Sequence, residues 1–502
     1  MKTVLEFLEE SCKKNKNKIA VIEEDKQITY EELLIKSKIV GTNLIEKIKI
    51  NDPVVVFMDK SIETLETFFG VVYAGGCYSL VNPEFPKGRI EQITEVLESN
   101  VIITNNEFLN LATEIFKNKI VLNVETLLKG EASFEKLSDI RDKKLDLDPV
   151  YINFTSGSTG VPKGVVVGNR SIIDFINEFT KTFNINENDI IANQAPFDFD
   201  VSVKDIYSAI KVGATLLIVP KRLFSNPAKL LDYLVDNKAT TMVWAVSALC
   251  LITTFHGLDY KVPETVNKII FSGEVMPIKH LNTWMSKLPN ATFINVYGPT
   301  EITCNCTYHI IDREKEYNGI IPIGKPFLNE KVFLLDENNK EVTETGSRGE
   351  ICVSGTCLAL GYYNNKTQTD SHFCQNPLNT KYIEFIYRTG DLGTINDEGE
   401  FVFAGRKDFQ IKYMGHRIEL EEIDREVSKI NNVVRAVTLF HEKKNKLYCF
   451  YIGNIEKEEI VEKLKESVPT YMVPSVFVKV EDFTLSKNGK IDRKILQKMI
   501  EE

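Results

Sequence analysis

The stretch that decides the fold is YINFTSGSTGVPKG, residues 151–164. It begins with an apolar run typical of a buried strand and continues in a loop rich in glycine and hydroxyl side chains that closes on Lys163. Glycines let backbone N–H groups approach a phosphate, hydroxyls donate to its oxygens, and a lysine supplies positive charge. The stretch therefore predicts a strand followed by a phosphate-binding loop. A flexible glycine and serine linker would not be expected directly after an apolar strand.

The spacing of this loop differs from that of P-loop NTPases. Gly157, Gly160 and Lys163 lie too close together for G-x-x-x-x-G-K-[ST], and Gly164 follows the lysine where that motif has Ser or Thr. A P-loop kinase is therefore not expected.

Hydrophobic patterning on both sides of the loop predicts an α/β fold. Short apolar runs alternate with amphipathic stretches, which is the pattern of parallel sheets covered by helices. The apolar runs are 53–58, 101–104, 215–220, 241–246 and 268–272, and the amphipathic stretches include 61–72 and 227–237.

The pattern changes toward the C-terminal end. From about residue 319 to 403, short strands are separated by clusters of turn residues, which predicts an antiparallel β-rich lobe. Beyond it, helix-like stretches at 419–430 and 456–466 flank strand-like stretches at 436–440 and 447–452. We expect α/β lobes to about residue 318, a β-rich lobe over about 319–407, and a small α+β domain over 408–502.

Composition narrows the class of protein. The chain has 502 residues and a formal net charge of −10, which argues against nucleic-acid binding because that needs clustered Lys and Arg. Its nine cysteines lack paired metal-ligand spacing and suit reduced cytosolic thiols. Glutamates interrupt the apolar N-terminal stretch, so we expect a helix there and no signal peptide. The apolar window 242–252 is too short to span a membrane and is expected to be a strand running into a helix. We expect a cytoplasmic monomer without a membrane span.

Residues 155–164 resemble the phosphate-loop signature of the adenylate-forming superfamily, which includes acyl-CoA synthetases, luciferases and peptide-synthetase adenylation domains. Further motifs follow in the family's order: TYEEL (29–33), NVYGPTE (295–301), GEICVSG (349–355), YRTGD (387–391), GRKD (405–408), GHRIE (415–419) and NGKIDR (488–493). The resemblance covers nearly the whole chain. It implies a large N-terminal domain over 1–407, a small mobile C-terminal domain over 408–502, and activation of a carboxylic acid as an acyl-AMP.

The resemblance also implies a set of ATP-binding residues. They are Thr155, Ser156, Gly157, Ser158, Thr159, Gly160, Lys163, Asn295, Val296, Tyr297, Gly298, Pro299, Thr300, Asp391, Phe403, Arg406, Lys412 and Lys490. For Lys412, a solvated strand lysine is an equally good interpretation.

Three of the implied roles have a clear chemical reason. Tyr297 offers an aromatic face for the purine, and Asp391, with Arg406 nearby, resembles the family's acceptor for the ribose hydroxyls. Glu301 is a hard oxygen ligand suited to the Mg²⁺ that accompanies ATP. The alternative for residues 297–299 is a tight turn, and for Asp391 a turn aspartate.

Lys490 resembles the family's catalytic lysine, which bridges the substrate carboxylate and the α-phosphate. A positioned cation is needed because a carboxylate anion and ATP repel each other. Asp408 matches the hinge about which the small domain rotates, so that Lys490 leaves and a thiol arrives.

The segment 195–203, APFDFDVSV, resembles the amino-acid-activating branch, in which an aspartate at the place of Asp200 pairs with the substrate ammonium. The alternative is a helix N-cap. The implied pocket is small and rather polar. Its lining is Asp200, Val201, Lys204, Ser247, Ile270, Ser272, Val296, Cys304 and Asn305.

The chain is most similar to stand-alone amino-acid adenylation enzymes such as D-alanine carrier-protein ligases, but it departs from them at Ser272 and Lys204. An inward Lys204 would favour aspartate or glutamate. An outward Lys204, paired with Asp205 or another acid, would leave D-alanine or another small amino acid as the substrate.

No carrier module follows the last motif, so the resemblance implies a separate phosphopantetheinylated carrier protein as the thiol acceptor. An acyl-CoA ligase that uses free coenzyme A is the first alternative. A non-catalytic scaffold of the same fold is the second.

Overall fold

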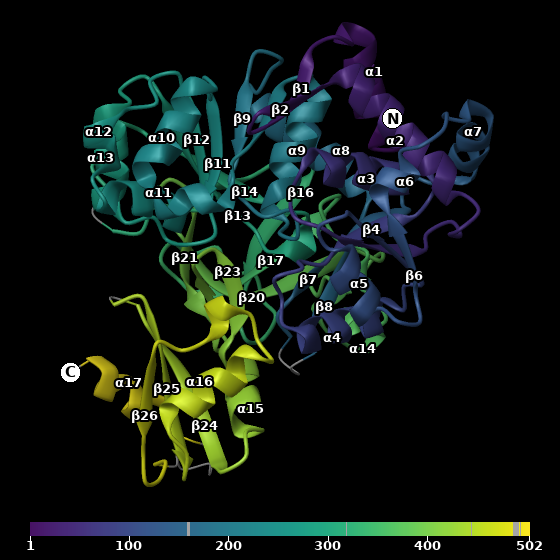
Figure 1. Ribbon diagram of the computed structural model, residues 1–502. Helices are drawn as coiled ribbons and strands as arrows, with labels where there is room; N and C mark the ends of the chain where they lie inside the picture. Colours follow the sequence, from purple (N-terminus) through teal and green to yellow (C-terminus); the bar gives the residue numbers. More distant parts are fainter. Residues whose placement is uncertain (158–160, 318, 443, 485–490, 492, 502) are drawn as a thin grey trace. The chain divides into compact units, whose positions relative to one another are not determined.

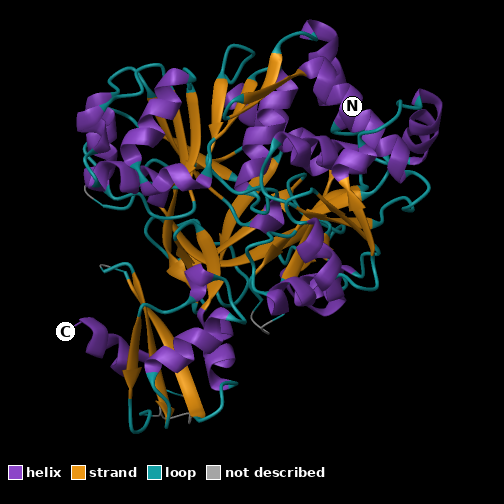
Figure 2. Ribbon diagram, viewed as in Figure 1, coloured by secondary structure: helices purple, strands orange, loops and turns teal. Residues whose placement is uncertain are grey.

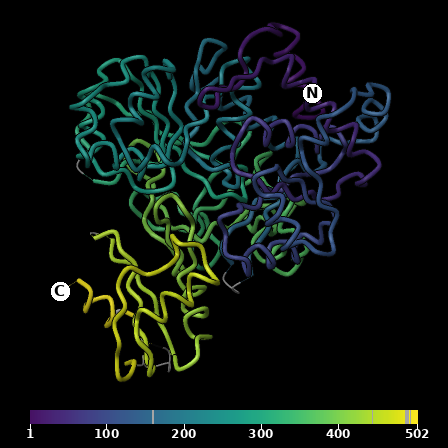
Figure 3. Tube along the Cα trace, in the orientation of Figure 1, coloured from purple at the N-terminus to yellow at the C-terminus, as the bar shows by residue number. Residues whose placement is uncertain are grey.

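The chain folds into two compact units in a computed structural model (Figure 1) that describes residues 1–157, 161–317, 319–442, 444–484, 491 and 493–501. The first unit comprises Met1–Pro83, Leu97–Phe154 and Gly164–Lys407. The second comprises Glu84–Val96, Thr155–Lys163 and Asp408–Glu502. Figure 3 traces the chain through both units, with the stretch after residue 407 in yellow.

The largest sheet of the first unit has nine strands in the order β15-β14-β13-β12-β11-β9-β10-β1-β2. Its central strands are parallel, and β2, β14 and β15 are antiparallel to their neighbours. The strands are β1 (Ile19–Glu23), β2 (Lys26–Thr29), β9 (Ile190–Asn193), β10 (Thr215–Ile218), β11 (Thr241–Ala245), β12 (Lys268–Ser272), β13 (Thr292–Tyr297), β14 (Thr307–Ile310) and β15 (Lys325–Pro326).

A second sheet has seven strands in the order β18-β8-β7-β4-β3-β5-β6. Its strands are β3 (Pro53–Phe57), β4 (Cys77–Leu80), β5 (Val101–Thr104), β6 (Ile120–Asn123), β7 (Pro149–Thr155), β8 (Lys163–Gly168) and β18 (Gly361–Tyr362). Strands β3, β4, β5, β6 and β7 run parallel in it.

Helices cover these sheets, as the purple and orange elements of Figure 2 show. The helices of the first unit are α1 (Leu5–Asn15), α2 (Tyr30–Leu44), α3 (Ile62–Tyr73), α5 (Leu109–Ile115), α6 (Val124–Leu127), α7 (Phe134–Lys143), α8 (Asn169–Thr182), α9 (Val201–Val212), α10 (Pro227–Asp236), α11 (Val246–Thr254), α12 (Gly257–Tyr260), α13 (Ile278–Lys287) and α14 (Lys366–His372), with the 3₁₀ helices η1 (Lys221–Ser225) and η2 (Thr300–Ile302).

Alternating side chains divide the nine-stranded sheet between two cores. On β11, Val243 joins a core that links both sheets with α1, α2, α3, α8 and α9. Its neighbours Met242 and Trp244 point to the opposite face and pack with α10, α11 and α13. A strand that is buried on both faces is apolar at nearly every position, so these strands could be predicted from the sequence.

The predicted α/β fold with a β-rich lobe is confirmed. Strands β3, β5, β10, β11 and β12 begin at the predicted residues and end within two residues of the predicted ends. The window 242–252 is indeed strand β11 running directly into helix α11. Helix α3 starts where it was expected because Ser61 caps it, its side chain accepting from the N–H of Thr64.

The β-rich lobe of the first unit is a five-stranded antiparallel sheet. Its strands are β16 (Glu330–Leu335), β17 (Gly349–Gly355), β19 (Phe373–Gln375), β20 (Phe385–Ile395) and β21 (Phe401–Arg406). Strand β20 lies at its centre, so the YRTGD motif is part of a paired strand.

The second unit contains a three-stranded sheet, β24 (Val433–His441), β25 (Lys446–Gly453) and β26 (Val476–Lys479), and a hairpin, β22 (Gln410–Tyr413) and β23 (His416–Glu419). Its helices are α15 (Leu420–Ser428), α16 (Lys457–Lys465), α17 (Arg493–Glu501) and most of α4 (Lys87–Leu97), with the 3₁₀ helix η3 (Thr470–Met472).

Two segments that the sequence analysis placed in the large domain belong to the second unit, 84–96 and 155–163. Arg89 forms a buried ion pair with Glu422, Nη1 to Oε1 at 2.7 Å. The Ser156 hydroxyl donates to the carbonyl oxygen of Arg417 at 2.9 Å. These contacts explain the grouping, because each joins one of the two segments to the stretch after residue 407.

None of the helices among the described residues has the length and apolar content needed to cross a membrane. The nine cysteines are free thiols.

Candidate functional site

The candidate site lies where neighbouring parallel strands of the nine-stranded sheet end. In the order β9, β11, β12 and β13, these strands share one direction and one carboxyl edge. Asn193 ends β9, Ser272 ends β12 and Tyr297 ends β13, while Ser247 follows the end of β11. Ligands of open α/β sheets bind outside the carboxyl ends of their strands, so this edge is the expected place for a substrate.

Tyr297 and Arg406 both contact the carboxylate of Asp391. The Tyr297 hydroxyl donates to Asp391 Oδ2, and Arg406, which lies opposite Asp391 in the pairing of β20 with β21, forms an ion pair with Oδ1. Burial raises the pKa of Tyr297 well above its usual value, so the hydroxyl keeps its proton and remains a donor. An ionised carboxylate has about four acceptor positions, so Asp391 retains capacity for a ribose hydroxyl. Asp391 lies within a strand and not in a turn.

The segment 295–301 is held tightly after β13. The Asn295 amide donates to the carbonyl oxygen of Pro322 at 2.8 Å. A Cβ on Gly298 would lie 2.5 Å from the Cα of Asn305, so only glycine fits this close approach. Glu301 is fully buried, and its Oε1 accepts from the Tyr362 hydroxyl at 2.8 Å.

Glu301 is the candidate metal ligand. Groups of three or more His, Cys, Asp or Glu placed to hold a metal do not occur in the part of the chain that the structure describes. Mg²⁺ in nucleotide enzymes binds one or two carboxylates and completes its shell with water and substrate phosphates. A single buried carboxylate therefore fits a metal that arrives with ATP.

The predicted phosphate loop belongs to the second unit, which includes Thr155–Lys163. Thr155, Ser156 and Lys163 are buried, and Thr155 Oγ1 has no hydrogen-bond partner among the described residues. Ser158, Thr159 and Gly160 lie outside the described residues, and so does Lys490.

The other residues of the predicted nucleotide set and hinge are spread over β21, β22 and the link between them. Phe403 is half-buried on β21 and Lys412 half-buried on β22. Asp408 is exposed, and its Oδ1 accepts from the N–H of Gln410 at 3.2 Å.

Five residues of the predicted amino-acid pocket are brought together around α9. Lys204 lies on this helix, and its Nζ donates to Asn305 Oδ1 at 2.7 Å and to Ser272 Oγ at 3.4 Å. Cys304 Sγ donates to the carbonyl oxygen of Asp200 at 3.1 Å. Lys204 is only 1 % exposed and donates to two residues of the predicted pocket, so the alternative in which it points outward and pairs with Asp205 or another acid is wrong.

Asp200 directly precedes α9 and is 7 % exposed. Its side chain makes no capping hydrogen bond to this helix, so the N-cap alternative does not explain it. Val201, the first residue of α9, and Ser247, in the first turn of α11, are half-buried.

Burial dominates the electrostatics of Lys204. It lowers the pKa of this ammonium, and the charges of Cys304, Asp200 and Asp205 oppose the effect. Both hydrogen-bond acceptors of Lys204 are uncharged. A buried cation on neutral acceptors is costly, so the site suits a ligand that brings a negative charge.

Comparison with known proteins decides the family. A model described as AMP-binding enzyme matches residues 8–363. The chain belongs to the AMP-binding enzyme family.

Similar members are known from bacteria. The chain is 33 % identical over 506 residues to zwittermicin A synthase ZmaJ of Bacillus cereus, a match that covers 98 % of this chain and 94 % of that protein. It is 33 % identical over 507 residues to gramicidin S synthase 2 of Brevibacillus brevis, where the match covers 99 % of this chain but only 11 % of the relative.

Solved structures share the fold. The Vibrio cholerae adenylation domain AlmE, in complex with glycyl-adenosine-5'-phosphate, has a TM-score of 0.86 at 22 % identity and covers 99 % of this chain and 97 % of that chain. Holo-PA1221, an NRPS protein containing adenylation and PCP domains, has a TM-score of 0.84 at 21 % identity and covers 99 % of this chain and 84 % of that chain. The resemblance to the adenylate-forming superfamily is thereby confirmed, and a particular likeness to D-alanine ligases is not part of these findings.

Sequence reasoning missed three residues beside the site of this AMP-binding enzyme: Lys60, Asn193 and Asp205. Lys60 follows β3 and Asn193 ends β9, so both lie at carboxyl ends of parallel strands, which is the signal that could have found them. Asp205 had been considered only as an outward partner of Lys204, but it is fully buried.

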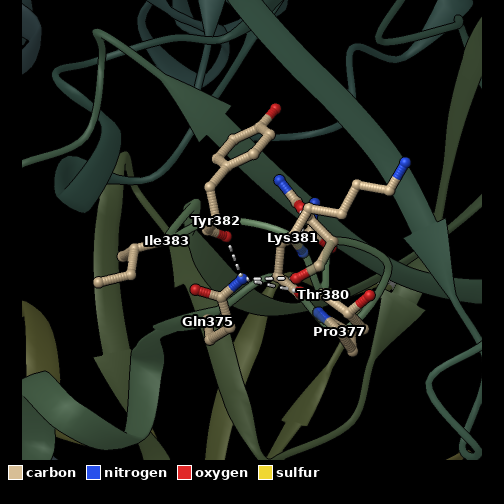
Figure 4. A pocket seen from close by; sticks show the side chains of 8 residues that line it. Gln375, Pro377, Thr380, Lys381, Tyr382 and Ile383 are labelled. Carbon is tan, nitrogen blue, oxygen red and sulfur yellow. Dashed lines mark hydrogen bonds between the residues drawn. The ribbon is translucent and has the colours of Figure 1, made fainter.

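A separate pocket of about 410 Å³ lies in the loop between β19 and β20 and contains none of the predicted site residues. Figure 4 shows Gln375 among the residues that line it, and its side-chain amide donates to the carbonyl oxygens of Asn376, Asn379 and Tyr382. These bonds hold the loop together and suggest no chemistry.

Proposed function

We propose that the protein is an AMP-forming ligase that activates an amino acid with ATP and transfers it to the phosphopantetheine thiol of a carrier protein. In the first step a substrate carboxylate oxygen attacks the α-phosphorus of ATP, and pyrophosphate leaves with the bonding electrons. In the second the carrier thiol gives its proton to solvent, the sulfur attacks the acyl carbon, and AMP leaves. Membership of the AMP-binding enzyme family supports this reaction class.

Each candidate site residue has a proposed role that follows from its chemistry. Asp391, with Tyr297 and Arg406, would accept hydrogen bonds from the ribose, and Lys490 would bridge the carboxylate and the α-phosphate. Glu301 would bind Mg²⁺, which neutralises phosphate charge when it is present. Asp200 would pair with the substrate ammonium, because a buried carboxylate at the start of α9 without a capping role suits a cationic ligand.

One observation carries the substrate class: the buried Lys204 ammonium donates to two neutral side chains, Asn305 and Ser272. Aspartate or glutamate would supply the missing negative charge through its side chain. A small neutral amino acid such as D-alanine would offer the Lys204 ammonium no charged side-chain partner. We therefore propose an acidic amino acid as the substrate.

The carrier protein is the proposed acceptor. Two structural neighbours, holo-PA1221 and the fused NpsA-ThdA protein, are described as adenylation domains with a PCP domain. Because the chain is acidic overall, docking of an acidic carrier would need a local basic or apolar surface.

The test is an ATP–pyrophosphate exchange panel over D- and L-amino acids, β-alanine and acids without an amine. We expect aspartate or glutamate to stimulate exchange most, and AMP to be released in quantity only after a phosphopantetheinylated carrier is added. Formation of ADP, or exchange without any dependence on an added acid, would contradict the reaction class. Best turnover with alanine or glycine would contradict the acidic substrate, and equal transfer to coenzyme A and to every carrier would make the protein an acyl-CoA ligase.

A further inference from the structure

Two buried tyrosines form a chain of hydrogen bonds that ends on the candidate metal ligand. The Tyr362 hydroxyl donates to Glu301 Oε1 at 2.8 Å, and its oxygen lies 3.3 Å from the hydroxyl oxygen of Tyr387. Glu301 and Tyr387 are fully buried, and Tyr362 is 5 % exposed. Neither tyrosine is among the predicted site residues, and the proposed function gives neither of them a role.

The chemistry of the three groups determines the direction of these hydrogen bonds. A carboxylate that binds a metal is ionised and can only accept, whereas each phenol has a single proton to donate. Tyr362 gives its proton to Glu301, so Tyr387 must be the donor in the contact between the two hydroxyls. In such a chain each bond polarises the next, which strengthens the bond to the carboxylate.

The three residues lie on three different elements of the first unit. Glu301 is on the 3₁₀ helix η2, Tyr362 on β18 and Tyr387 on β20. The Phe373 ring packs against both tyrosine rings, with centroids 5.8 Å from that of Tyr362 and 4.9 Å from that of Tyr387. Because both rings are packed in the interior, their hydroxyls are held in place relative to the carboxylate.

A donor on one oxygen of a carboxylate orients the group for a metal without using up its capacity. An ionised carboxylate has about four acceptor positions, and Tyr362 occupies one of them on Glu301 Oε1. Hydrogen bonds of this kind set the direction of metal-binding side chains, and their loss typically costs about 10- to 100-fold in metal affinity or activity. Glu301 is the one protein ligand that the proposed function assigns to Mg²⁺, so its orientation matters the more.

We propose that Tyr362, supported by Tyr387, is a positioning residue that orients the Glu301 carboxylate for the Mg²⁺ that binds with ATP. Tyr362 acts through Glu301 and does not itself contact the metal. The inference rests on the proposed function, because Glu301 is assigned there to Mg²⁺. It predicts that the two hydroxyls matter for the metal and not for the nucleotide alone.

The decisive variant is Tyr362→Phe, which keeps the ring and removes the donated proton. The readout is binding and not turnover. Mn²⁺, which prefers the same oxygen ligands as Mg²⁺, serves as a paramagnetic probe, and its affinity for the full-length protein with α,β-methylene-ATP is measured by water proton relaxation. We expect this affinity to fall about 10- to 100-fold. Tyr387→Phe removes only the supporting bond, so it should lower the affinity less.

A double-mutant cycle separates this role from a structural one. Glu301→Gln should weaken the metal site by itself, and adding Tyr362→Phe should cost little more, because the tyrosine acts through the carboxylate. The matched control is Tyr363→Phe, which removes a hydroxyl from the next, half-buried residue and should leave the Mn²⁺ affinity unchanged. The affinity for the ATP analogue in EDTA, measured by calorimetry, should be the same in the wild type, Tyr362→Phe and Tyr363→Phe.

The outcomes distinguish this inference from the proposed function. Equal Mn²⁺ affinity in Tyr362→Phe and the wild type, or fully additive losses in the cycle, would overturn the role of Tyr362. Unchanged Mn²⁺ binding in Glu301→Gln would overturn it too, and so would loss of metal-free nucleotide binding in Tyr362→Phe. A coupled loss of Mn²⁺ affinity in a protein without amino-acid-dependent exchange would support the inference and refute the proposed reaction alone.

Discussion

Replacing Lys204 by methionine is the sharpest test of the pocket. Methionine has a similar length but no charge, so the variant loses the hydrogen bonds to Asn305 and Ser272. For an acidic substrate, removal of one partner of a buried ion pair costs about 3–5 kcal/mol. Because 1.36 kcal/mol is tenfold in rate, kcat/KM for glutamate or aspartate should fall by roughly 10²- to 10³-fold or more. Alanine and glutamine have uncharged side chains, so the variant should activate them as well as the wild type does, or better.

The free enzyme gives a second prediction for the same variant. Replacing a buried charge by an apolar side chain often stabilises a protein by about 1–4 kcal/mol, while leaving the Asn305 oxygen unpaired costs about 1–3 kcal/mol. These effects oppose each other, so the free energy of unfolding in urea should stay within about 2 kcal/mol of the wild type. The control is Lys211→Met on the same helix, whose ammonium donates to Thr180 and not to the pocket. An unchanged ratio of glutamate to alanine in Lys204→Met, measured by pyrophosphate exchange, would refute the reasoning.

Three further changes test the proposed roles. Asp200→Ala removes the partner of the substrate ammonium, so it should cost about 3–5 kcal/mol in kcat/KM and abolish discrimination against the des-amino acid; a preserved discrimination would exclude that role. Lys490→Ala should reduce adenylate formation by orders of magnitude yet leave transfer from preformed acyl-AMP nearly intact, and equal losses in single-turnover assays of both steps would argue against it. Tyr297→Phe removes a donor to a charged Asp391, so KM for ATP should rise roughly 10- to 100-fold with amino-acid KM unchanged.

Much of the fold was predictable because its strands are buried on both faces. Strands such as β5 (Val101–Thr104) and β12 (Lys268–Ser272) therefore read as continuous apolar runs and were predicted to the residue. The predicted nucleotide motifs could be named for another reason, since close backbone approach and phosphate binding would demand particular residue types. Gly298 illustrates this, because even a Cβ would collide with Asn305.

The grouping of segments far apart in sequence was not predictable. The boundary at residue 408 agreed with a change in patterning, but the segment 84–96 joins the second unit through Arg89 and Glu422, which lie on different helices. Periodicity indicates which residues of a helix share a face. It does not indicate which other helix packs on that face.

By itself, the sequence determined the family and the α/β fold class, because these depend on local patterns and residue types. The candidate site residues that it named stay predictions. Only the tertiary structure decided the direction of Lys204. The sequence left both directions open for Lys204, but α9 is packed on nearly all sides, and Lys204 and Asp205 are both buried. The tertiary structure also brought Asn193 to Asp205 and Lys60 to Asn193, since parallel strands end at one edge and place residues distant in sequence in contact. No local pattern of the sequence encodes these contacts.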